Sequence, residues 1–304
     1  MNYVNGEYPV GFDLSLDFFS SAKMDVLDII PSKNKFIIKT TAGDKLLKKL
    51  NYKKPEFEVK AYEKLITWKG EIYCITDLQW DRLCDYRNIE DVAMAVKALA
   101  NFHEAGKTYG FGSIKSYNEN LIYGLKNMKN NLDFFGKIAM DIEYKNGFDE
   151  IFLKNISNYL GKMEVSIANI EDKLVEDTQG ATLCINNFSQ YNIFIKDKEA
   201  FFTDFDKLKV DLRCCDLWDF INKALKHQNN DLELVNIILE EYENTSRLRS
   251  EEIQIIIGLL LFPIEFYELI KAYYTRRKNW SEATFINKLI KILEDDEKRQ
   301  LELL

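Results

Sequence analysis

The sequence predicts an α+β protein with two lobes: a small β-containing N-terminal lobe over residues 1–80 and a large, mainly helical C-terminal lobe over residues 81–304. Strand-like runs gather in the first 80 residues, whereas helical periodicity dominates the remainder. A single β-hairpin pattern, residues 183–206, interrupts the helical part. We place the lobe boundary near Leu78 to Asp85.

The N-terminal lobe begins with two β-like runs, Lys35 to Thr41 and Lys45 to Leu50, which flank a short turn containing Gly43. Pro55 then begins a predicted helix, EFEVKAYEKLITW. Its apolar residues recur at helical spacing: Phe57, Ala61, Tyr62 and Leu65. A short strand, EIYCITDL, follows Gly70.

The C-terminal lobe is predicted from apolar stripes at helical spacing. Two stripes precede the hairpin: Val92, Val96, Leu99 and His103, and then Ile156, Tyr159, Leu160 and Met163. Three helical segments follow it: LWDFINKAL, LELVNIILEEY and IIIGLLLFPIEFYELIKAYY. We expect His103, the Tyr273-Tyr274 pair and Trp280 to be core residues.

Composition excludes several classes of protein. The 304 residues are 46% apolar and 13% aromatic, which supplies a real core. The net charge is −8 with Lys and Arg scattered throughout, which argues against a nucleic-acid partner. The five cysteines form no C-x-x-C pair, so we expect buried thiols in a reducing compartment. The N-terminus does not resemble a signal peptide, and the apolar run Ile253 to Phe262 is too short to cross a bilayer. We therefore expect cytoplasmic synthesis and no membrane partner.

Three polar residues around the predicted hairpin have the spacing of a phosphotransferase site. Kinase-like enzymes place a catalytic Asp, an Asn five residues later, and an Asp beyond the next hairpin. The Asn and the second Asp bind Mg²⁺, and the first Asp accepts the proton of the attacking hydroxyl. Here Asn192 and Asp204 occupy the metal positions, but Asn187 stands at the base position. An amide is not a base at physiological pH, so the pattern predicts a kinase scaffold without its central chemical group.

These segments, in this order, resemble the aminoglycoside phosphotransferase and choline kinase superfamily, which has a bilobal protein-kinase-like fold. The C-terminal segment more closely resembles CotS-type spore-coat proteins of endospore-forming bacteria. The quoted segments are AGDKLLKKL, LANFHEAGKTYGF, TLCINNFSQYNIFI, FFTDFDKLKVDLRCCDLWDFI and LLFPIEFYELIKAYYTRRKNW. Together they cover nearly the whole chain.

The chain departs from this family at the catalytic loop. The family pattern is His-x-Asp, where this sequence has Ile185 and Asn187. Loss of a general base costs about 10²–10⁴ in rate, although positioning and electrostatics can leave residual activity. Alternatively, Asn187 only braces a turn. Asp216 is expected to be structural, because its family counterpart accepts hydrogen bonds from the backbone of the catalytic loop.

The resemblance also implies a lysine that contacts nucleotide phosphates. Lys48 follows Leu47 as the pattern requires, with Lys45 and Lys49 as rivals. Its partner would be Glu58 or, as an alternative, Glu63. The segment where a glycine-rich loop would lie, IIPSKNKF, contains no glycine. Asp206 could add a carboxylate to the metal site.

The leading hypothesis is a degenerate kinase-like protein of the spore coat that retains a Mg²⁺–ATP cleft and has other spore-coat proteins as partners. The alternative is an active ATP-dependent phosphotransferase that acts on a small molecule or a coat protein. A third hypothesis is a scaffold that binds no nucleotide.

Overall fold

The computed structural model describes residues 15–32, 35–50, 63–77, 82–107, 115–176, 181–203, 207–228 and 231–302. The chain divides into two compact units. The first unit comprises Met1–Cys84 and Ser189–Asp206, and the second comprises Asp85–Phe188 and Lys207–Leu304. Residues 189–206, which the sequence predicts to belong to the helical lobe, group with the first unit. The predicted α+β class is confirmed.

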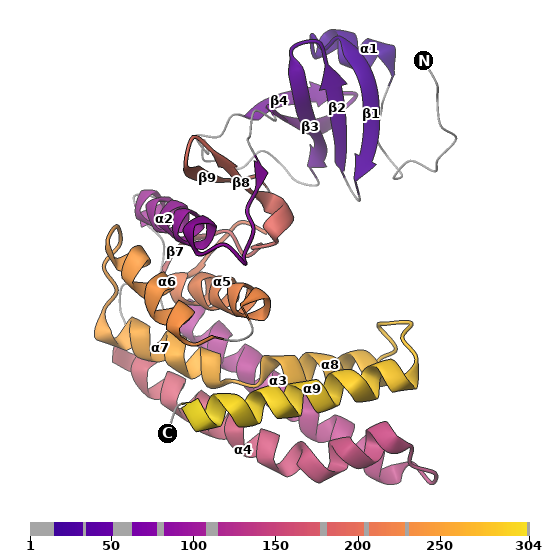
Figure 1. Cartoon of the computed structure of the whole chain (residues 1–304), viewed down its shortest axis with the longest axis vertical. Helices are drawn as coiled ribbons and strands as arrows, with labels where there is room; N and C mark the ends of the chain where they lie inside the picture. The colour runs from indigo at the N-terminus through magenta and orange to yellow at the C-terminus, as the bar shows by residue number, and fades with distance from the viewer. Residues whose placement is uncertain are drawn as a thin grey trace. The chain divides into compact units, whose positions relative to one another are not determined.

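The first unit contains an antiparallel sheet with the strand order β1-β2-β3-β5-β4. Its strands are β1 (Val26–Ser32), β2 (Lys35–Thr40), β3 (Gly43–Leu50), β4 (Glu63–Trp68) and β5 (Glu71–Asp77). A short helix, α1 (Leu16–Ser21), lies beside this sheet (Figure 1). Phe18 of α1 is fully buried against Phe36, Leu47 and Tyr73. The runs expected from 35–41 and 45–50 are confirmed as β2 and β3.

Alternation along β2 and β3 separates two faces of the sheet. Phe36 and Leu47 belong to the core packed beneath α1. Their neighbours Lys35 and Lys48 therefore point to the opposite face, because successive side chains of a strand alternate. Lys35 and Lys48 are direct cross-strand partners in the register of β2 and β3. The sheet thus presents two lysines side by side on its face away from the core.

The predicted helix over residues 56–68 is wrong in its second half. Glu63–Trp68 is strand β4, paired with β5 from Glu63 to Trp68, while residues 51–62 lie outside the described residues. The turn explains the error: Lys69 and Gly70 both have positive φ (48° and 81°), which forms a two-residue hairpin of the primed type. Ile66 and Trp68, one β-branched and one aromatic, pack against the sheet core.

A second, smaller sheet of the first unit contains the expected central hairpin. Its order is β6-β8-β9, with β6 (Arg82–Leu83), β8 (Ile193–Lys196) and β9 (Glu199–Phe202). Asp197 and Lys198 have positive φ and make the two-residue turn between β8 and β9. A 3₁₀ turn, Gln190–Asn192, leads directly into β8.

The second unit is mainly helical. Its helices are α2 (Ile89–Gly106), α3 (Lys115–Asp141), α4 (Gly147–Glu176), α5 (Arg213–His227), α6 (Glu233–Glu243), α7 (Ser250–Leu261), α8 (Ile264–Tyr274) and α9 (Glu282–Glu302). Strands β7 (Ala181–Cys184) and β10 (Lys209–Leu212) form a two-stranded sheet beside α2 and α5. The long helices α3 and α4 pack together, and α4 also packs against α7. The predicted helical segments of this lobe are confirmed, except that the last one is divided into α7 and α8 by a break at Phe262 and Pro263.

Aromatic packing joins the C-terminal helices to α4. Tyr273 stacks on Phe148 with ring centroids 3.9 Å apart, and Tyr274 donates a hydrogen bond to Asp149 at 2.7 Å. Burial, with Asp149 as acceptor, raises the pKa of the Tyr274 hydroxyl. The pair is therefore core packing, as predicted. Trp280 lies against Phe285 but is 40% exposed, so the prediction that it is a core residue is wrong.

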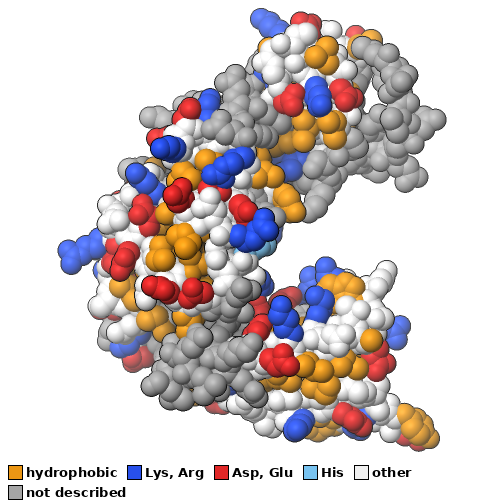
Figure 2. All heavy atoms as spheres, in the orientation of Figure 1, with side chains coloured by type: hydrophobic (Ala, Val, Ile, Leu, Met, Phe, Trp, Pro, Cys, Tyr) orange, Lys and Arg blue, Asp and Glu red, His pale blue; other side chains and the backbone are white. Residues whose placement is uncertain are grey.

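Charged side chains of both signs are dispersed over the visible face (Figure 2), as the composition suggests. Among the described residues, no single helix is long and apolar enough to cross a membrane; α7 and α8 together pass by length and composition alone, with a bend of 42° between them.

Candidate functional site

A buried carboxylate holds the predicted catalytic loop in place. Asp216, in the first turn of α5, accepts hydrogen bonds from the backbone nitrogen of Ile185 at 2.6 Å and from that of Asn186 at 2.9 Å. Both acceptor oxygens belong to a side chain with no exposed surface. The structural role expected for Asp216 is confirmed. The loop is thus fixed through its backbone, although Ile185 occupies the position of the family's histidine.

The loop presents Asn187 at the surface of the second unit. Asn186 has a positive φ of 53°, a conformation that Asn tolerates better than most residues. Its side-chain nitrogen donates to the carbonyl of Cys184 at 3.2 Å, which stabilises the reversal after β7. Asn187 is half-buried, and the next residue, Phe188, is fully buried. The predicted base position, Asn187, is therefore a half-buried residue directly after a backbone that Asp216 holds.

Arg213 and Glu252 anchor the start of α5 and with it Asp216. Arg213 donates to both carboxylate oxygens of Glu252, each at 2.5 Å, and to Ser246 Oγ at 2.7 Å. Glu252 is fully buried and Arg213 is 4% exposed. Burial opposes ionisation of Glu252, yet the hydrogen bonds from Arg213 keep the pKa of Glu252 below its ordinary value.

This ion pair predicts a loss of stability in acid. Because the pKa of Glu252 is lower in the folded state, its carboxylate contributes stability above the ordinary pKa of 4.5, and that stability is lost as the pH falls through the folded pKa. Glu252→Gln should lower the free energy of unfolding at pH 7 by about 2 kcal/mol, the value of a charge-assisted hydrogen bond, and should reduce its fall below pH 4.5. Urea unfolding at pH 7 and pH 4 measures both effects; identical pH dependence in the two proteins would contradict this role.

His103 takes part in the same buried network. Its Nε2 lies 3.1 Å from Asp216 Oδ2, and its Nδ1 lies 2.7 Å from the hydroxyl of Tyr242. His103, Asp216 and Cys184 are close enough to share a metal ion. However, burial raises the pKa of the Cys184 thiol well above its usual range, and metals bind the thiolate. Both nitrogens of His103 already have partners, so we interpret the cluster as polar core, as expected for His103.

The first unit holds the predicted nucleotide lysine. Lys48 is 5% exposed, whereas Lys45 and Lys49 are half-buried. Burial therefore distinguishes Lys48 from its two rivals. Its predicted partner Glu58 lies outside the described residues, and the alternative, Glu63, is the first residue of β4.

Asn192 and Asp204 are the two predicted Mg²⁺ ligands, and Asn192 lies among the described residues. Asp204 lies outside them, as does Asp206, the possible additional carboxylate. The backbone nitrogen of Asn192 donates to the Ser189 carbonyl at 2.8 Å, and its carbonyl accepts from the backbone nitrogen of Thr203 at 3.0 Å. These bonds fix Asn192 beside the residue that precedes Asp204. Asn192 is 6% exposed.

The amide oxygen of Asn192 already faces a cation. Lys35 Nζ donates to Asn192 Oδ1 at 3.3 Å. A Mg²⁺ ion coordinated by that oxygen would lie about 2.1 Å from it, close to the ammonium. Two unit charges 4 Å apart repel by about 4 kcal/mol at an effective dielectric constant of 20, and a divalent ion doubles that energy. The amide oxygen of Asn192 therefore does not fit a magnesium ion while the Lys35 ammonium donates to it.

Lys35 is the residue that sequence reasoning missed. It lies in IIPSKNKF, the segment that we noted only because it has no glycine. Its relation to Lys48 depends on the register of β2 and β3, and its bond to Asn192 spans 157 residues of sequence. The sequence signal for this residue was the run KNK, residues 33–35, which ends at the first residue of β2. Two lysines in this run do not identify a partner.

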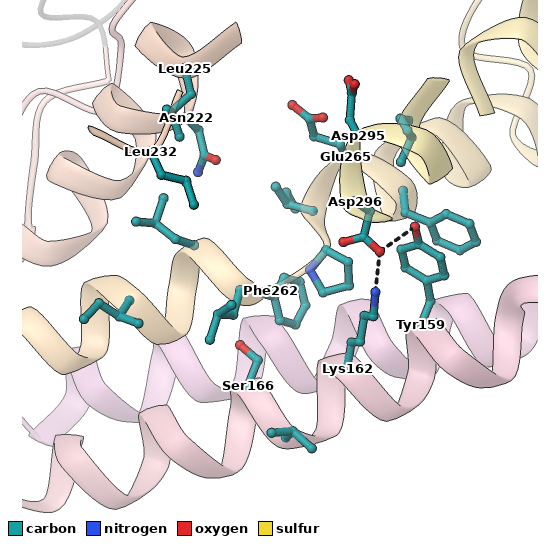
Figure 3. Close-up of a pocket in the computed structure, with 18 of the residues that line it drawn as sticks. Tyr159, Lys162, Ser166, Asn222, Leu225, Leu232, Phe262, Glu265, Asp295 and Asp296 are labelled. Carbon is teal, nitrogen blue, oxygen red and sulfur yellow. Dashed lines mark hydrogen bonds and ion pairs between the residues drawn. The ribbon is translucent and has the colours of Figure 1, made fainter. Parts of the chain in front are cut away.

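The second unit also contains a cavity of about 1040 Å³ between α4, the ends of α5 and α7, and the starts of α6 and α8. Its walls are largely apolar, with Leu225, Leu232 and Phe262 among them (Figure 3). Lys162 points to Asp296 of α9, which also accepts from the Tyr159 hydroxyl at 3.2 Å. Ligand pockets of drug-sized molecules measure about 300–1,000 Å³, so this cavity has room for a sizeable organic group.

Acidic groups lie on one side of this cavity. Glu265 and Asp295 appear opposite Asn222 and Leu232 in the close-up (Figure 3). Glu265 forms an ion pair with Lys226 at 3.0 Å. Glu265 and Asp296 thus already have lysine partners, and the feature of this cavity that suits a ligand is its largely apolar wall.

A β-rich unit with a buried strand lysine, and a helical unit with a carboxylate-braced loop after β7, define a protein-kinase-like phosphotransferase fold. Solved structures agree. An aminoglycoside phosphotransferase from Alicyclobacillus acidocaldarius superposes with a TM-score of 0.76 at 15% identity over 92% of each chain. ADP-bound aminoglycoside phosphotransferase APH(2'')-Ib gives 0.54 at 12% identity, covering 92% of this chain and 95% of the other. Choline kinase LicA from Streptococcus pneumoniae gives 0.50 at 11%, covering 93% and 97%.

The chain belongs to the family described as "Spore coat putative kinase YutH", whose model matches residues 39–303. The endospore coat-associated protein YutH of Bacillus subtilis (strain 168) is 23% identical over 186 residues. The match covers 58% of this chain and 53% of that protein, so it spans about half the length of the relative. The predicted superfamily and spore-coat group are confirmed. The finer CotS-type assignment stays a prediction.

Proposed function

We propose that this protein is a degenerate phosphotransferase of the spore coat, which binds a nucleotide but lacks the group that starts phosphoryl transfer. The single observation that carries this proposal is Asn187, an amide at the base position of a loop held by Asp216. Asp216 holds the loop backbone through two hydrogen bonds, yet the Asn187 side chain cannot accept the proton of an attacking hydroxyl.

Nucleotide binding is supported by Lys48. Lys48 is 5% exposed and lies on the face of the sheet away from the hydrophobic core, and an ammonium is a common ligand of phosphate oxygens. A related fold, APH(2'')-Ib, was solved with ADP bound. A Mg²⁺ ion held by Asn192 and Asp204 would compete with the Lys35 ammonium for the amide oxygen of Asn192. Nucleotide binding in this proposal therefore does not require that ion.

Family membership supports a place in the spore coat with other coat proteins as partners. The cavity of the second unit offers a described space for a partner or acceptor group.

Thermal unfolding with ATP tests the binding proposal. A ligand at 100 times its Kd stabilises the folded state by about 2.7 kcal/mol, which raises the Tm of a chain of this size by roughly 5 °C. We expect this shift in the unmodified protein, and we expect Lys48→Met to abolish it. Lys45→Met, on the same strand, should keep it. Absence of a shift with ATP, with Mg²⁺ and with both would exclude nucleotide binding and favour a plain scaffold.

A second candidate function is retained phosphotransferase activity toward a small molecule or a coat protein. The cavity of about 1040 Å³ favours it, because its volume is that of a pocket for a small organic molecule. ATP turnover by the unmodified chain separates this candidate from the degenerate enzyme.

A further inference from the structure

Two lysines occupy neighbouring positions on the same face of the first unit's sheet. Lys35 on β2 and Lys48 on β3 are directly paired in the antiparallel register. Directly opposed side chains of a sheet have Cβ atoms about 4.5–5.5 Å apart, and like charges at such positions repel. Two ammonium groups on one face of the sheet can both donate hydrogen bonds to the oxygens of one anion.

Lys35 also reaches the position where the kinase spacing predicts a metal ligand. Its ammonium donates to Asn192 Oδ1 at 3.3 Å, across two segments of the same unit. The acceptor is well fixed, because both backbone groups of Asn192 are hydrogen-bonded and the residue is 6% exposed. Lys35 itself is half-buried at the first position of β2.

An ammonium can perform one of the tasks of a metal ion in nucleotide binding. It supplies fixed positive charge and up to three hydrogen bonds to phosphate oxygens. It cannot coordinate several oxygens at about 2.1 Å as Mg²⁺ does, so it favours holding a nucleotide over aligning its phosphates for transfer. Such a role suits a chain whose sequence has Asn187 where the kinase spacing predicts a base.

We propose that the Lys35 ammonium takes the place of a divalent cation at Asn192, so that Lys35 and Lys48 bind the phosphates of a nucleoside di- or triphosphate without Mg²⁺. This inference rests on the proposed nucleotide binding. It adds a specific ligand-binding residue, Lys35, and a specific property, independence of metal.

Calorimetric titration with ATP, in excess EDTA and separately in MgCl₂, tests the proposal on the full chain. The unmodified protein should show Kd values within about threefold of each other, because no metal takes part in the contact. Lys35→Met should weaken binding in EDTA by about tenfold or more, the effect of one charge-assisted hydrogen bond, and MgCl₂ should restore it. Lys35→Arg keeps the charge and should bind in EDTA.

Lys39→Met is the matched control, since Lys39 lies on the same face of β2 and is exposed. It should behave as the unmodified protein does. Thermal unfolding of each variant verifies that it is folded.

The possible results distinguish failure of the Lys35 proposal from failure of the proposed nucleotide binding. Binding by the unmodified protein that needs MgCl₂ would overturn the inference and leave the proposed nucleotide binding intact. Metal-independent binding that Lys35→Met leaves unchanged would likewise remove Lys35 from the site. If no variant binds ATP under either condition, the proposed nucleotide binding itself fails and the inference fails with it.

Discussion

Asp216→Ala is expected to lower the free energy of unfolding by about 3–5 kcal/mol, the cost of breaking a buried charged network. The substitution leaves the backbone nitrogens of Ile185 and Asn186 without their acceptor, and it removes the partner of His103 Nε2. The Asp216 side chain that makes these contacts has no exposed surface. Urea unfolding at pH 7 measures the change.

Two further variants separate the brace from a general effect on α5. Asp219→Ala, on the same helix, removes only a half-exposed ion pair with Lys223, so its cost should be below about 1 kcal/mol. Asp216→Asn keeps one acceptor oxygen and should fall between the two. A loss for Asp216→Ala as small as that for Asp219→Ala would show that the loop does not depend on this carboxylate.

Asn187→Asp is expected to raise the rate of γ-phosphate transfer to water or an added hydroxyl compound by about 10²–10⁴, the usual contribution of a general base. The reason is that Asp restores a proton acceptor on a backbone that Asp216 already fixes. Single-turnover release of phosphate from ATP, measured with and without MgCl₂, gives the rate.

The control for this gain is Asn186→Asp, which adds a carboxylate at the neighbouring loop position without replacing Asn187. It should give no increase. An Asn187→Asp protein that binds ATP but transfers no faster than the unmodified chain would show that the loop lacks more than its base, and Ile185 would be the first residue to examine.

Much of the fold followed from the sequence because its signals are local. Strands β2 and β3 and the long helices of the second unit follow from strand patterns and apolar periodicity. Asp216 was assigned correctly because the resemblance supplied its role. Strand β4 was missed because its apolar residues fit a helical spacing, and only the primed turn at Lys69 and Gly70 and its pairing with β5 distinguish a strand.

The candidate site was less accessible to sequence reasoning. The burial of Lys48, which separates it from Lys45 and Lys49, depends on the packing of the face away from the core. The contact between Lys35 and Asn192 joins residues far apart in sequence, and periodicity cannot reveal it. The Arg213–Glu252 pair is similar, because 39 residues separate its members.

The measurement that tests the account most directly is single-turnover loss of γ-phosphate from radiolabelled ATP bound to the unmodified protein, with Asp204→Ala as the comparison. We predict that the unmodified chain, at ATP concentrations that stabilise it, releases phosphate no faster than Asp204→Ala does. Robust turnover by the unmodified chain that disappears in Asp204→Ala would contradict the account and identify an active phosphotransferase.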